Sequence, residues 1–194
     1  MNAIFLGSFN PPHIGHLNAI QSVLEDDYYK IIDRIHIIPC KQNPNKSTYK
    51  TSYIARYKMC EMLFKDLIDA GVVVIDDIEN EILPEYTYDL LKWINNNDYI
   101  IGKDFKWIIT EETLEEIINN KWHNSKEILN EFGARMIVLS DNKSRYEDLN
   151  YIDLRPGINV HSTDIRNLAK ECNSIELYTN KDISDFIKNN KIYR

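Results

Sequence analysis

Short apolar runs of strand type alternate with segments of helical periodicity along the whole sequence. Six runs are rich in apolar and β-branched residues, at 2–6, 34–40, 72–76, 106–110, 134–140 and 158–160. Between them, apolar residues recur three and four positions apart, as they do on one face of a helix. Because parallel strands need a crossover between them, this alternation predicts an α/β fold, a Rossmann-like doubly wound parallel sheet with helices on both faces. No linker interrupts the pattern, so we expect a single domain over residues 1–194.

Three helix starts can be placed from single residues. Pro11 and Pro12 exclude a helix immediately before them but favour the start of one. We therefore expect a helix to begin within a residue or two of His13. Thr87 is well placed as the N-cap of a later helix. The last strand leads through the sequence HSTD into a helix that we expect from about Ile165.

The composition excludes several classes of protein. The formal net charge of −7 argues against a general nucleic-acid binder, which needs a basic surface. The sequence has no apolar stretch of about 18 residues and no charged-then-apolar leader, so we expect a soluble, cytoplasmic protein without membrane contact. Cys40, Cys60 and Cys172 lack C-x-x-C spacing, which indicates reduced thiols and predicts neither a disulfide nor a zinc site.

The segment GSFNPPHIGHL at 7–17 places two histidines three residues apart at a predicted helix start. His13 and His16 then face the same side of the first turn, where free N–H groups bind anions. The positive helix end disfavours protonation, so we expect both rings to be largely neutral until phosphate binds. Gly7 and Gly15 allow a ligand to approach the backbone closely. The spacing therefore predicts a phosphate site.

The segment NVHSTDIR at 159–166 repeats this arrangement of a strand, polar residues and a helix. Taken alone, Ser162 or Thr163 is more often a simple N-cap, and Arg166 a solvated surface charge. Taken with the histidine segment, the hydroxyls and the planar guanidinium suit several phosphate groups in a row. The two segments together predict a polyphosphate site.

Both segments resemble signatures of the nucleotidyltransferase superfamily. GSFNPPHIGH resembles G-[ST]-F-[DN]-P-x-H-x-G-H, and VHSTDIR resembles the partner motif I-S-S-T-x-I-R. Within the superfamily the chain is similar to the bacterial-type nicotinate-nucleotide adenylyltransferases, and the similarity extends over nearly the whole chain. It includes IIPCKQNPNK, an R-x-x-M helix, the loop before DLL, a Trp segment and the closing DFIKNNKIY, with Lys46, Arg56, Met59, Tyr86, Thr87, Asp89 and Trp122 at the matching positions.

The chain departs from the family pattern at a few positions. Thr110 and Glu112 lie where the family has the Gly and Asp of I-G-x-D, so the adenosine contacts are open to question. His161 replaces the first Ser of S-S-T, and Asn45 replaces a His. These changes keep open a nucleotide-binding sensor that has lost catalysis.

The resemblance implies adenylyl transfer from ATP to nicotinate mononucleotide, with nicotinamide mononucleotide as an alternative acceptor. The products are the dinucleotide, deamido-NAD or NAD, and pyrophosphate, which places the reaction in NAD biosynthesis. Such a transfer needs positioning and electrostatic stabilisation rather than a nucleophile. Mg²⁺ would enter bound to the ATP phosphates, and we expect no protein ligands to the metal.

The resemblance also implies roles for individual residues. Catalysis is assigned to His13, His16 and Arg166. The residues expected to bind ATP are Gly7, Ser8, Phe9, His13, His16, Thr110, Glu112, Ser162, Thr163 and Arg166. Those expected to bind the pyridine nucleotide are Ser8, Lys46, Tyr86, Thr87 and Trp122, although Trp122 and Tyr86 have core packing as an alternative and Lys46 a solvated surface position.

Three other readings differ in substrate or class. Pantetheine-phosphate adenylyltransferases run the same reaction on another phosphate acceptor, but they are usually shorter and lack the Y-T-x-D loop. Class I aminoacyl-tRNA synthetases share the letters HIGH, yet 194 residues leave no room for a tRNA-binding body. The inactive nucleotide sensor is the third. The oligomeric state is open, with a homo-oligomer among the alternatives.

Overall fold

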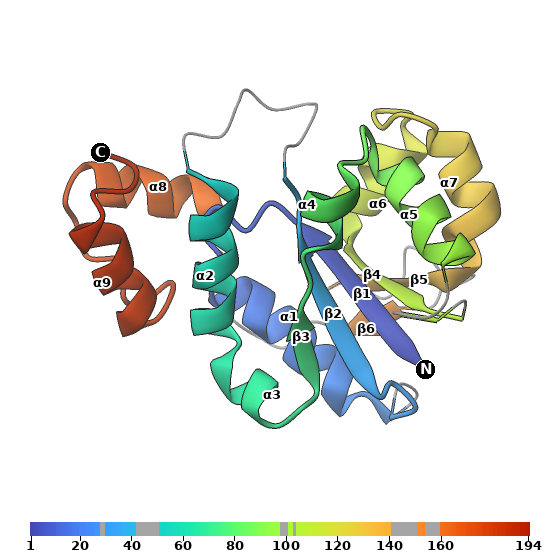
Figure 1. Ribbon diagram of the computed structural model, residues 1–194, viewed down its shortest axis with the longest axis horizontal. Helices are drawn as coiled ribbons and strands as arrows, with labels where there is room; N and C mark the ends of the chain where they lie inside the picture. Colours follow the sequence, from blue (N-terminus) through green and yellow to red (C-terminus); the bar gives the residue numbers. More distant parts are fainter. Residues whose placement is uncertain (28–29, 42–50, 98–100, 103, 141–150, 154–159) are drawn as a thin grey trace.

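The computed structural model describes residues 1–27, 30–41, 51–97, 101–102, 104–140, 151–153 and 160–194. Within these ranges, six parallel strands form one sheet in the order β3-β2-β1-β4-β5-β6 (Figure 1). The strands are β1 (Asn2–Gly7), β2 (Arg34–Pro39), β3 (Val73–Ile75), β4 (Lys106–Thr110), β5 (Met136–Ser140) and β6 (Tyr151–Asp153). The strand order runs outward in opposite directions from β1 and β4, so the topological switch lies between these two strands.

Helices cover both faces of the sheet, as the sequence predicts (Figure 1). One face is covered by α1 (Ile14–Glu25), α2 (Tyr53–Leu63), α8 (Ser162–Lys170) and α9 (Lys181–Asn189). The other face is covered by α4 (Ile78–Ile82), α5 (Thr87–Asn96), α6 (Glu111–Ile118) and α7 (Ser125–Phe132). The short helix α3 (Lys65–Asp69) follows α2, and a 3-10 turn, η2 (Gly133–Arg135), follows α7.

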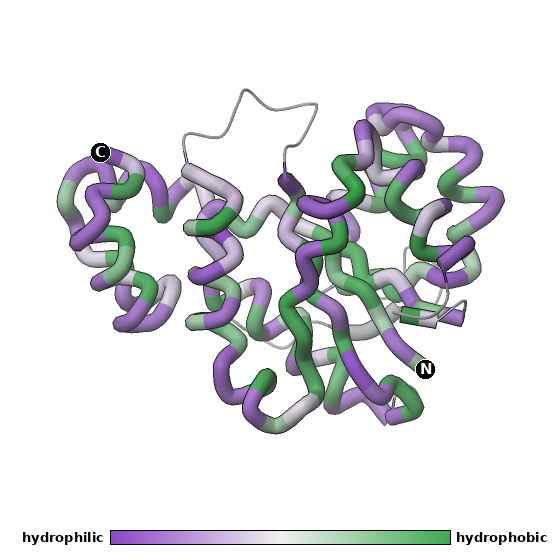
Figure 2. The backbone as a smooth tube through the Cα atoms, in the orientation of Figure 1, coloured by the Kyte–Doolittle hydropathy of each residue, from purple (hydrophilic) through white to green (hydrophobic). Residues whose placement is uncertain are grey.

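Alternation along the strands divides the core into two clusters. Ala3 and Phe5 of β1 pack with α1, whereas Ile4 between them packs with α5 and α6. In β4, Ile108 joins the first cluster and Trp107 the second. Successive strand side chains point to opposite faces, so a strand covered on both faces is apolar throughout. Figure 2 shows hydrophobic stretches in the central strands and mostly hydrophilic outer turns on α7 and α9.

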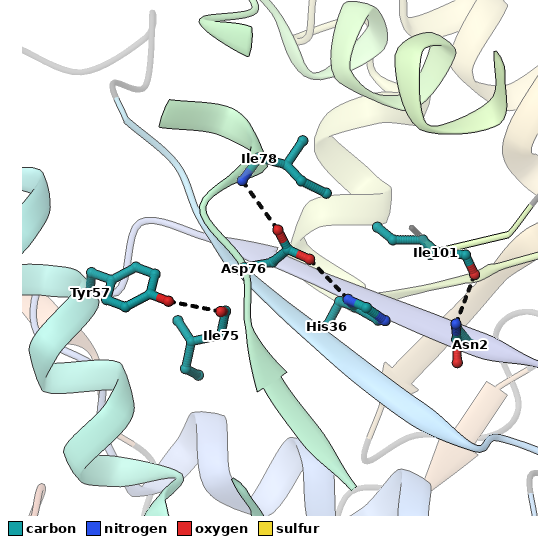
Figure 3. A network of polar contacts seen from close by, with 7 residues as sticks. All are labelled: Asn2, His36, Tyr57, Ile75, Asp76, Ile78 and Ile101. Atoms are coloured by element: carbon teal, nitrogen blue, oxygen red, sulfur yellow. Dashed lines mark hydrogen bonds and ion pairs between the residues drawn. The ribbon is translucent and has the colours of Figure 1, made fainter. Parts of the chain in front are cut away.

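A buried histidine–aspartate pair ties β2 to the turn after β3 (Figure 3). His36 Nδ1 lies 3.0 Å from Asp76 Oδ2. The second oxygen of Asp76 accepts a hydrogen bond from the backbone N–H of Ile78, at the start of α4 (3.3 Å). Nearby, Tyr57 of α2 donates to the carbonyl of Ile75 (2.9 Å). These contacts secure the start of α4, a helix that the sequence does not predict.

Several predicted boundaries need correction. The N-cap of α5 is Tyr86 and not Thr87, because Asp89 accepts the Tyr86 backbone N–H (3.1 Å) and so closes the helix one residue earlier. Helix α8 begins at Ser162 instead of near Ile165, since the backbone N–H of its N-cap, His161, donates to Asp164 Oδ2 (3.3 Å). Neither hydroxyl residue of that turn is therefore the cap.

The sixth strand is also misplaced by the sequence pattern. It is Tyr151–Asp153, whereas Val160 lies outside any strand and 158–159 lie outside the described residues. A pairing of three residues at a sheet edge gives almost no periodic signal. None of the three cysteines, all of which lie in the described part of the chain, takes part in a disulfide. In the described part of the chain, no helix has the length and apolar character that a membrane crossing requires.

The double-sided burial of β4 gives a stability prediction. Ile108 is 1% exposed, so Ile108→Ala should lower the free energy of unfolding by about 2–5 kcal/mol, through lost burial and a residual cavity. Ile118→Ala is the matched control, because Ile118 is 46% exposed on α6 and should change stability by no more than about 0.5 kcal/mol. Urea denaturation measures both, and equal losses would contradict this packing.

Candidate active site

The two predicted phosphate segments meet at the carboxyl end of β1, beside the topological switch. The loop from Ser8 to His13 follows β1, and α1 begins at Ile14, as expected. Ser162, the first residue of α8, donates to the carbonyl of Pro11 (2.9 Å). Ligands of open parallel sheets bind at this edge, so the position suits the predicted polyphosphate site.

The histidine rings pack against each other at the N-terminus of α1. His13 is the N-cap and His16 the third residue of the helix, and their ring centroids lie 3.8 Å apart. The backbone N–H of His13 donates to Nδ1 of His16 (3.1 Å). An imidazole nitrogen that accepts a hydrogen bond carries no proton, so neutral His16 holds its proton on Nε2. That N–H group is the one that can donate to a ligand.

Both rings are neutral near pH 7, in agreement with the sequence expectation. Burial is the largest cause that lowers the pKa of His13 to about 4, with the electrostatic influence of the neighbouring His161 as the second cause. Burial also lowers the pKa of His16 well below its ordinary value, with His13 as a second cause. The expected cause was the positive helix end, but the largest cause is removal of the rings from water.

The glycines near the histidines make room for side chains of the protein itself. A Cβ atom on Gly15 would lie 3.0 Å from His13 Nδ1, and one on Gly7 would lie 3.0 Å from the Phe9 ring. Phe9 is 1% exposed, and the centroid of its ring lies 4.9 Å from that of the His16 ring. Its side chain therefore packs beneath the histidines.

Arg166 is bonded to the histidine loop and is not a free surface charge. Its Nη1 donates to the carbonyl of Asn10 (2.8 Å), and its Nη2 donates to the hydroxyl of Thr163 (2.9 Å). The side chain is half-buried, whereas Thr163 is exposed. These contacts join a loop near the start of the chain to a helix more than 150 residues later.

A buried arginine and glutamate, given no role by the sequence analysis, hold the ends of β1 and β2 together. Arg56 is fully buried and donates to the carbonyls of Ser8 (2.7 Å) and Lys41 (2.9 Å). Glu79 accepts the backbone N–H of Lys41 (3.0 Å), and burial raises its pKa to about 7. The R-x-x-M similarity identified Arg56, but no sequence signal tells a buried arginine from a surface one.

Thr110 and Glu112 lie at the carboxyl end of β4. Thr110 is the N-cap of α6, and its hydroxyl accepts the backbone N–H of Thr113 (3.3 Å). Its backbone is extended (φ −88°), a conformation that any residue adopts, so losing the family glycine causes no strain here. Glu112 is exposed in the first turn of α6. Its carboxylate is thus free of the cap and accessible at this edge.

The residues expected at the pyridine site lie on two loops. The Tyr86 ring, before α5, stacks on His123 with centroids 3.9 Å apart and 18° between planes. Trp122 is half-buried near Trp107, and its indole N–H donates to Glu116 (2.8 Å). Part of the Trp122 side chain therefore packs against the core. The partner of Tyr86, His123, was not expected at the site.

The remaining expected residues are placed unevenly. Thr87 is the first residue of α5 and is half-buried, and Lys46 lies outside the described residues. Over the described ranges, no group of three His, Cys, Asp or Glu side chains is arranged to hold a metal ion.

Comparison with known proteins places the chain among nucleotidyltransferases. The model of the cytidylyltransferase-like family matches residues 4–168. A protein of Fusobacterium nucleatum, named a probable nicotinate-nucleotide adenylyltransferase, is 33% identical over 96% of each chain. A protein of the same name from Cytophaga hutchinsonii is 28% identical over 98% of this chain and 96% of its own.

A solved structure supports the same fold. Nicotinic acid mononucleotide adenylyltransferase from Plasmodium falciparum, in complex with NaAD, superposes with a TM-score of 0.79 at 19% identity. The match covers 98% of this chain and 96% of that one. At this identity the similarity shows the arrangement of helices and strands alone.

The buried histidines give a pH prediction. His13 should titrate near pH 4 in the free protein, as measured by NMR of the ring signals. Its folded pKa lies below the ordinary 6.5, so the unfolded chain binds more protons between pH 4 and 6.5 and stability rises with pH there.

The replacement His13→Asn should remove roughly 3 kcal/mol of this pH dependence, as measured by urea unfolding across the same window. A ring midpoint above pH 6, or an unchanged slope in the variant, would contradict the assignment.

Proposed function

Because the chain belongs to the cytidylyltransferase-like family, among the nicotinate-nucleotide adenylyltransferases, we propose that it transfers the adenylyl group of ATP to nicotinate mononucleotide. A phosphate oxygen of the mononucleotide attacks the α-phosphorus of ATP. The bond from that phosphorus to the bridging oxygen of the β-phosphate breaks, and pyrophosphate leaves. The product is deamido-NAD, so the reaction is a step of NAD biosynthesis.

The observation that carries the proposal is the meeting of the histidine pair with Arg166. The rings are buried and neutral, and the guanidinium lies on the same loop through its bond to the Asn10 carbonyl. Neutral imidazoles donate hydrogen bonds without repelling the nearby cation. Donors fixed before the reaction stabilise charge that develops in the transition state at little reorganisation cost.

Each group takes one part of the triphosphate in this proposal. His16 Nε2 and His13 donate to oxygens around the reacting α-phosphorus, and Arg166 neutralises the departing pyrophosphate. The backbone N–H groups of Ser162 and Thr163 at the N-terminus of α8 bind the β- and γ-phosphates together with the Thr163 hydroxyl, because the Ser162 hydroxyl donates to Pro11. Mg²⁺ would be held by the phosphates themselves, since the described residues offer no acidic cluster for it, and would neutralise part of their charge.

The nucleoside and the acceptor are assigned to the edges on either side of the phosphates. The end of β4 would hold adenosine, with the exposed Glu112 carboxylate as an acceptor for hydroxyl or amino groups. Thr110 would contribute its backbone, because its hydroxyl caps α6. The pyridine nucleotide would lie toward the Tyr86–His123 stack and Trp122, with Thr87 at the start of α5 and Ser8 and Lys46 on its phosphate.

The reaction itself is the first test. Purified protein with ATP, Mg²⁺ and nicotinate mononucleotide should release pyrophosphate, and the amide mononucleotide and phosphopantetheine serve as alternative acceptors. His16→Ala, checked for folding by circular dichroism, should lower kcat about 100- to 1000-fold, the loss typical of one transition-state donor. ATP binding without pyrophosphate would indicate a sensor, and near-full activity in the variant would remove His16 from catalysis.

Arg166 should act on ATP rather than on the acceptor. Arg166→Ala should lower kcat/KM for ATP about 10- to 150-fold, since a charge-assisted hydrogen bond contributes about 1.5–3 kcal/mol, while the KM for nicotinate mononucleotide changes little.

Arg135→Ala is the matched control, because Arg135 packs over Phe105 (4.9 Å to the ring centroid) away from these residues and should leave kinetics unchanged. Equal loss of affinity for both substrates in the Arg166 variant would mean that the site is assigned wrongly.

A further inference from the structure

The end of the chain returns to the phosphate loop through one tyrosine. Tyr193 follows α9, and its hydroxyl donates to Oδ1 of Asn10 (2.7 Å). Figure 1 shows the C-terminus beside α8, the helix that carries Arg166. A hydrogen bond thus joins the second-last residue to the middle of the histidine segment.

Asn10 receives two bonds that fix it from opposite ends of the residue. Its side-chain oxygen accepts from Tyr193, and its backbone carbonyl accepts from Arg166 Nη1 (2.8 Å). Asn10 is 7% exposed, so its amide has little access to water as a substitute partner. Asn10 therefore connects the Tyr193 hydroxyl to the guanidinium of Arg166 through a single residue.

The tyrosine hydroxyl has a second polar contact, and nearby charges influence its pKa. Thr51, which is buried just before α2, hydrogen-bonds to this hydroxyl. The positive charges of Arg166 and Arg56 are close enough to lower its pKa. Burial nonetheless raises the pKa of Tyr193 well above its ordinary value. The phenol is therefore a neutral donor toward Asn10 throughout the physiological pH range.

The backbone around Tyr193 adopts an unfavourable conformation to place this ring. Lys191 (φ 52°) and Tyr193 (φ 70°) are both in the left-handed region, which costs free energy for residues other than glycine. The Tyr193 ring packs on the core cluster that includes α1, α2 and α9. Strained residues persist where surrounding contacts over-determine them, and such residues cluster at functional sites.

We propose that Tyr193 is a positioning residue for the phosphate site, orienting Asn10 so that Arg166 is aimed at the ATP phosphates. The inference rests on the proposed function and deepens it. Without the hydroxyl, the Asn10 side chain loses a buried partner, so the whole residue can shift together with the backbone carbonyl that holds Arg166. Arg166 is assigned to the ATP phosphates and not to the acceptor, so we expect the effect to be larger for ATP.

Removal of one hydroxyl group tests the proposal against a purely structural role. Tyr193→Phe should raise the KM for ATP about five- to twentyfold and leave the KM for nicotinate mononucleotide within about twofold, the range expected for one buried hydrogen bond. Tyr57→Phe is the matched control. It also deletes a donor to a backbone carbonyl, that of Ile75, but this carbonyl belongs to β3, which β2 separates from β1 and its phosphate loop. The kinetics of Tyr57→Phe should equal those of the wild type, and its loss of Tm should be similar to that of Tyr193→Phe.

A double-mutant cycle asks whether Tyr193 acts through Arg166. In an Arg166→Ala background, Tyr193→Phe should change kcat/KM for ATP by less than about twofold, because the group it positions is gone. An unchanged KM for ATP in the single variant, equal rises of both KM values, or full additivity in the double variant would overturn the proposal.

Calorimetric binding of ATP separates this inference from the proposed function. A wild-type protein that binds ATP but releases no pyrophosphate would refute the proposed activity. Weaker ATP binding in Tyr193→Phe, with unchanged binding in Tyr57→Phe, would still support the positioning role in that case. Equal ATP binding by the wild type and Tyr193→Phe would refute the positioning role of Tyr193.

Discussion

The site depends on two imidazole rings that are buried where β1 turns into α1. Burial keeps His13 and His16 neutral, and the bond from the His13 backbone to His16 Nδ1 selects the tautomer with a proton on Nε2. Phe9 packs beneath the rings, and glycine at positions 7 and 15 leaves the space that this packing requires. A hydrogen-bond donor is thereby oriented before any nucleotide arrives, which is what an electrostatic mechanism of group transfer needs.

Long-range hydrogen bonds join the loop that carries the histidines to distant parts of the chain. Asn10 lies between Arg166 of α8 and Tyr193 of the last turn, and Ser162 donates to Pro11. On the other side of the loop, buried Arg56 holds the carbonyl of Ser8. The loop after β1 is thus held by α8, by α2 and by the turn after α9, all on the same face of the sheet. Of the two cations that hold it, the half-buried Arg166 is also suited to a polyphosphate ligand, whereas Arg56 is fully buried.

The periodic parts of the structure could be predicted from sequence, and the parts made by distant contacts could not. Strand runs and helical spacing identified β1 to β5, and two prolines located the start of α1, because these signals are local. The starts of α5 and α8 were missed because Asp89 and Asp164 close the helices onto Tyr86 and His161, residues with weak cap preference. The roles of Arg56 and Tyr193 follow from partners far along the chain, which composition and spacing do not reveal.

The most direct test of the central claim is the response of the two histidine rings to the nucleotide. NMR titration of both rings can be run on the free protein and on its complex with Mg²⁺ and a non-hydrolysable ATP analogue. If the rings donate to the phosphates, the negative charge favours their protonated forms, and the midpoints of both should rise in the complex. Midpoints that stay unchanged while the analogue is bound would contradict the assignment of this pair to the triphosphate.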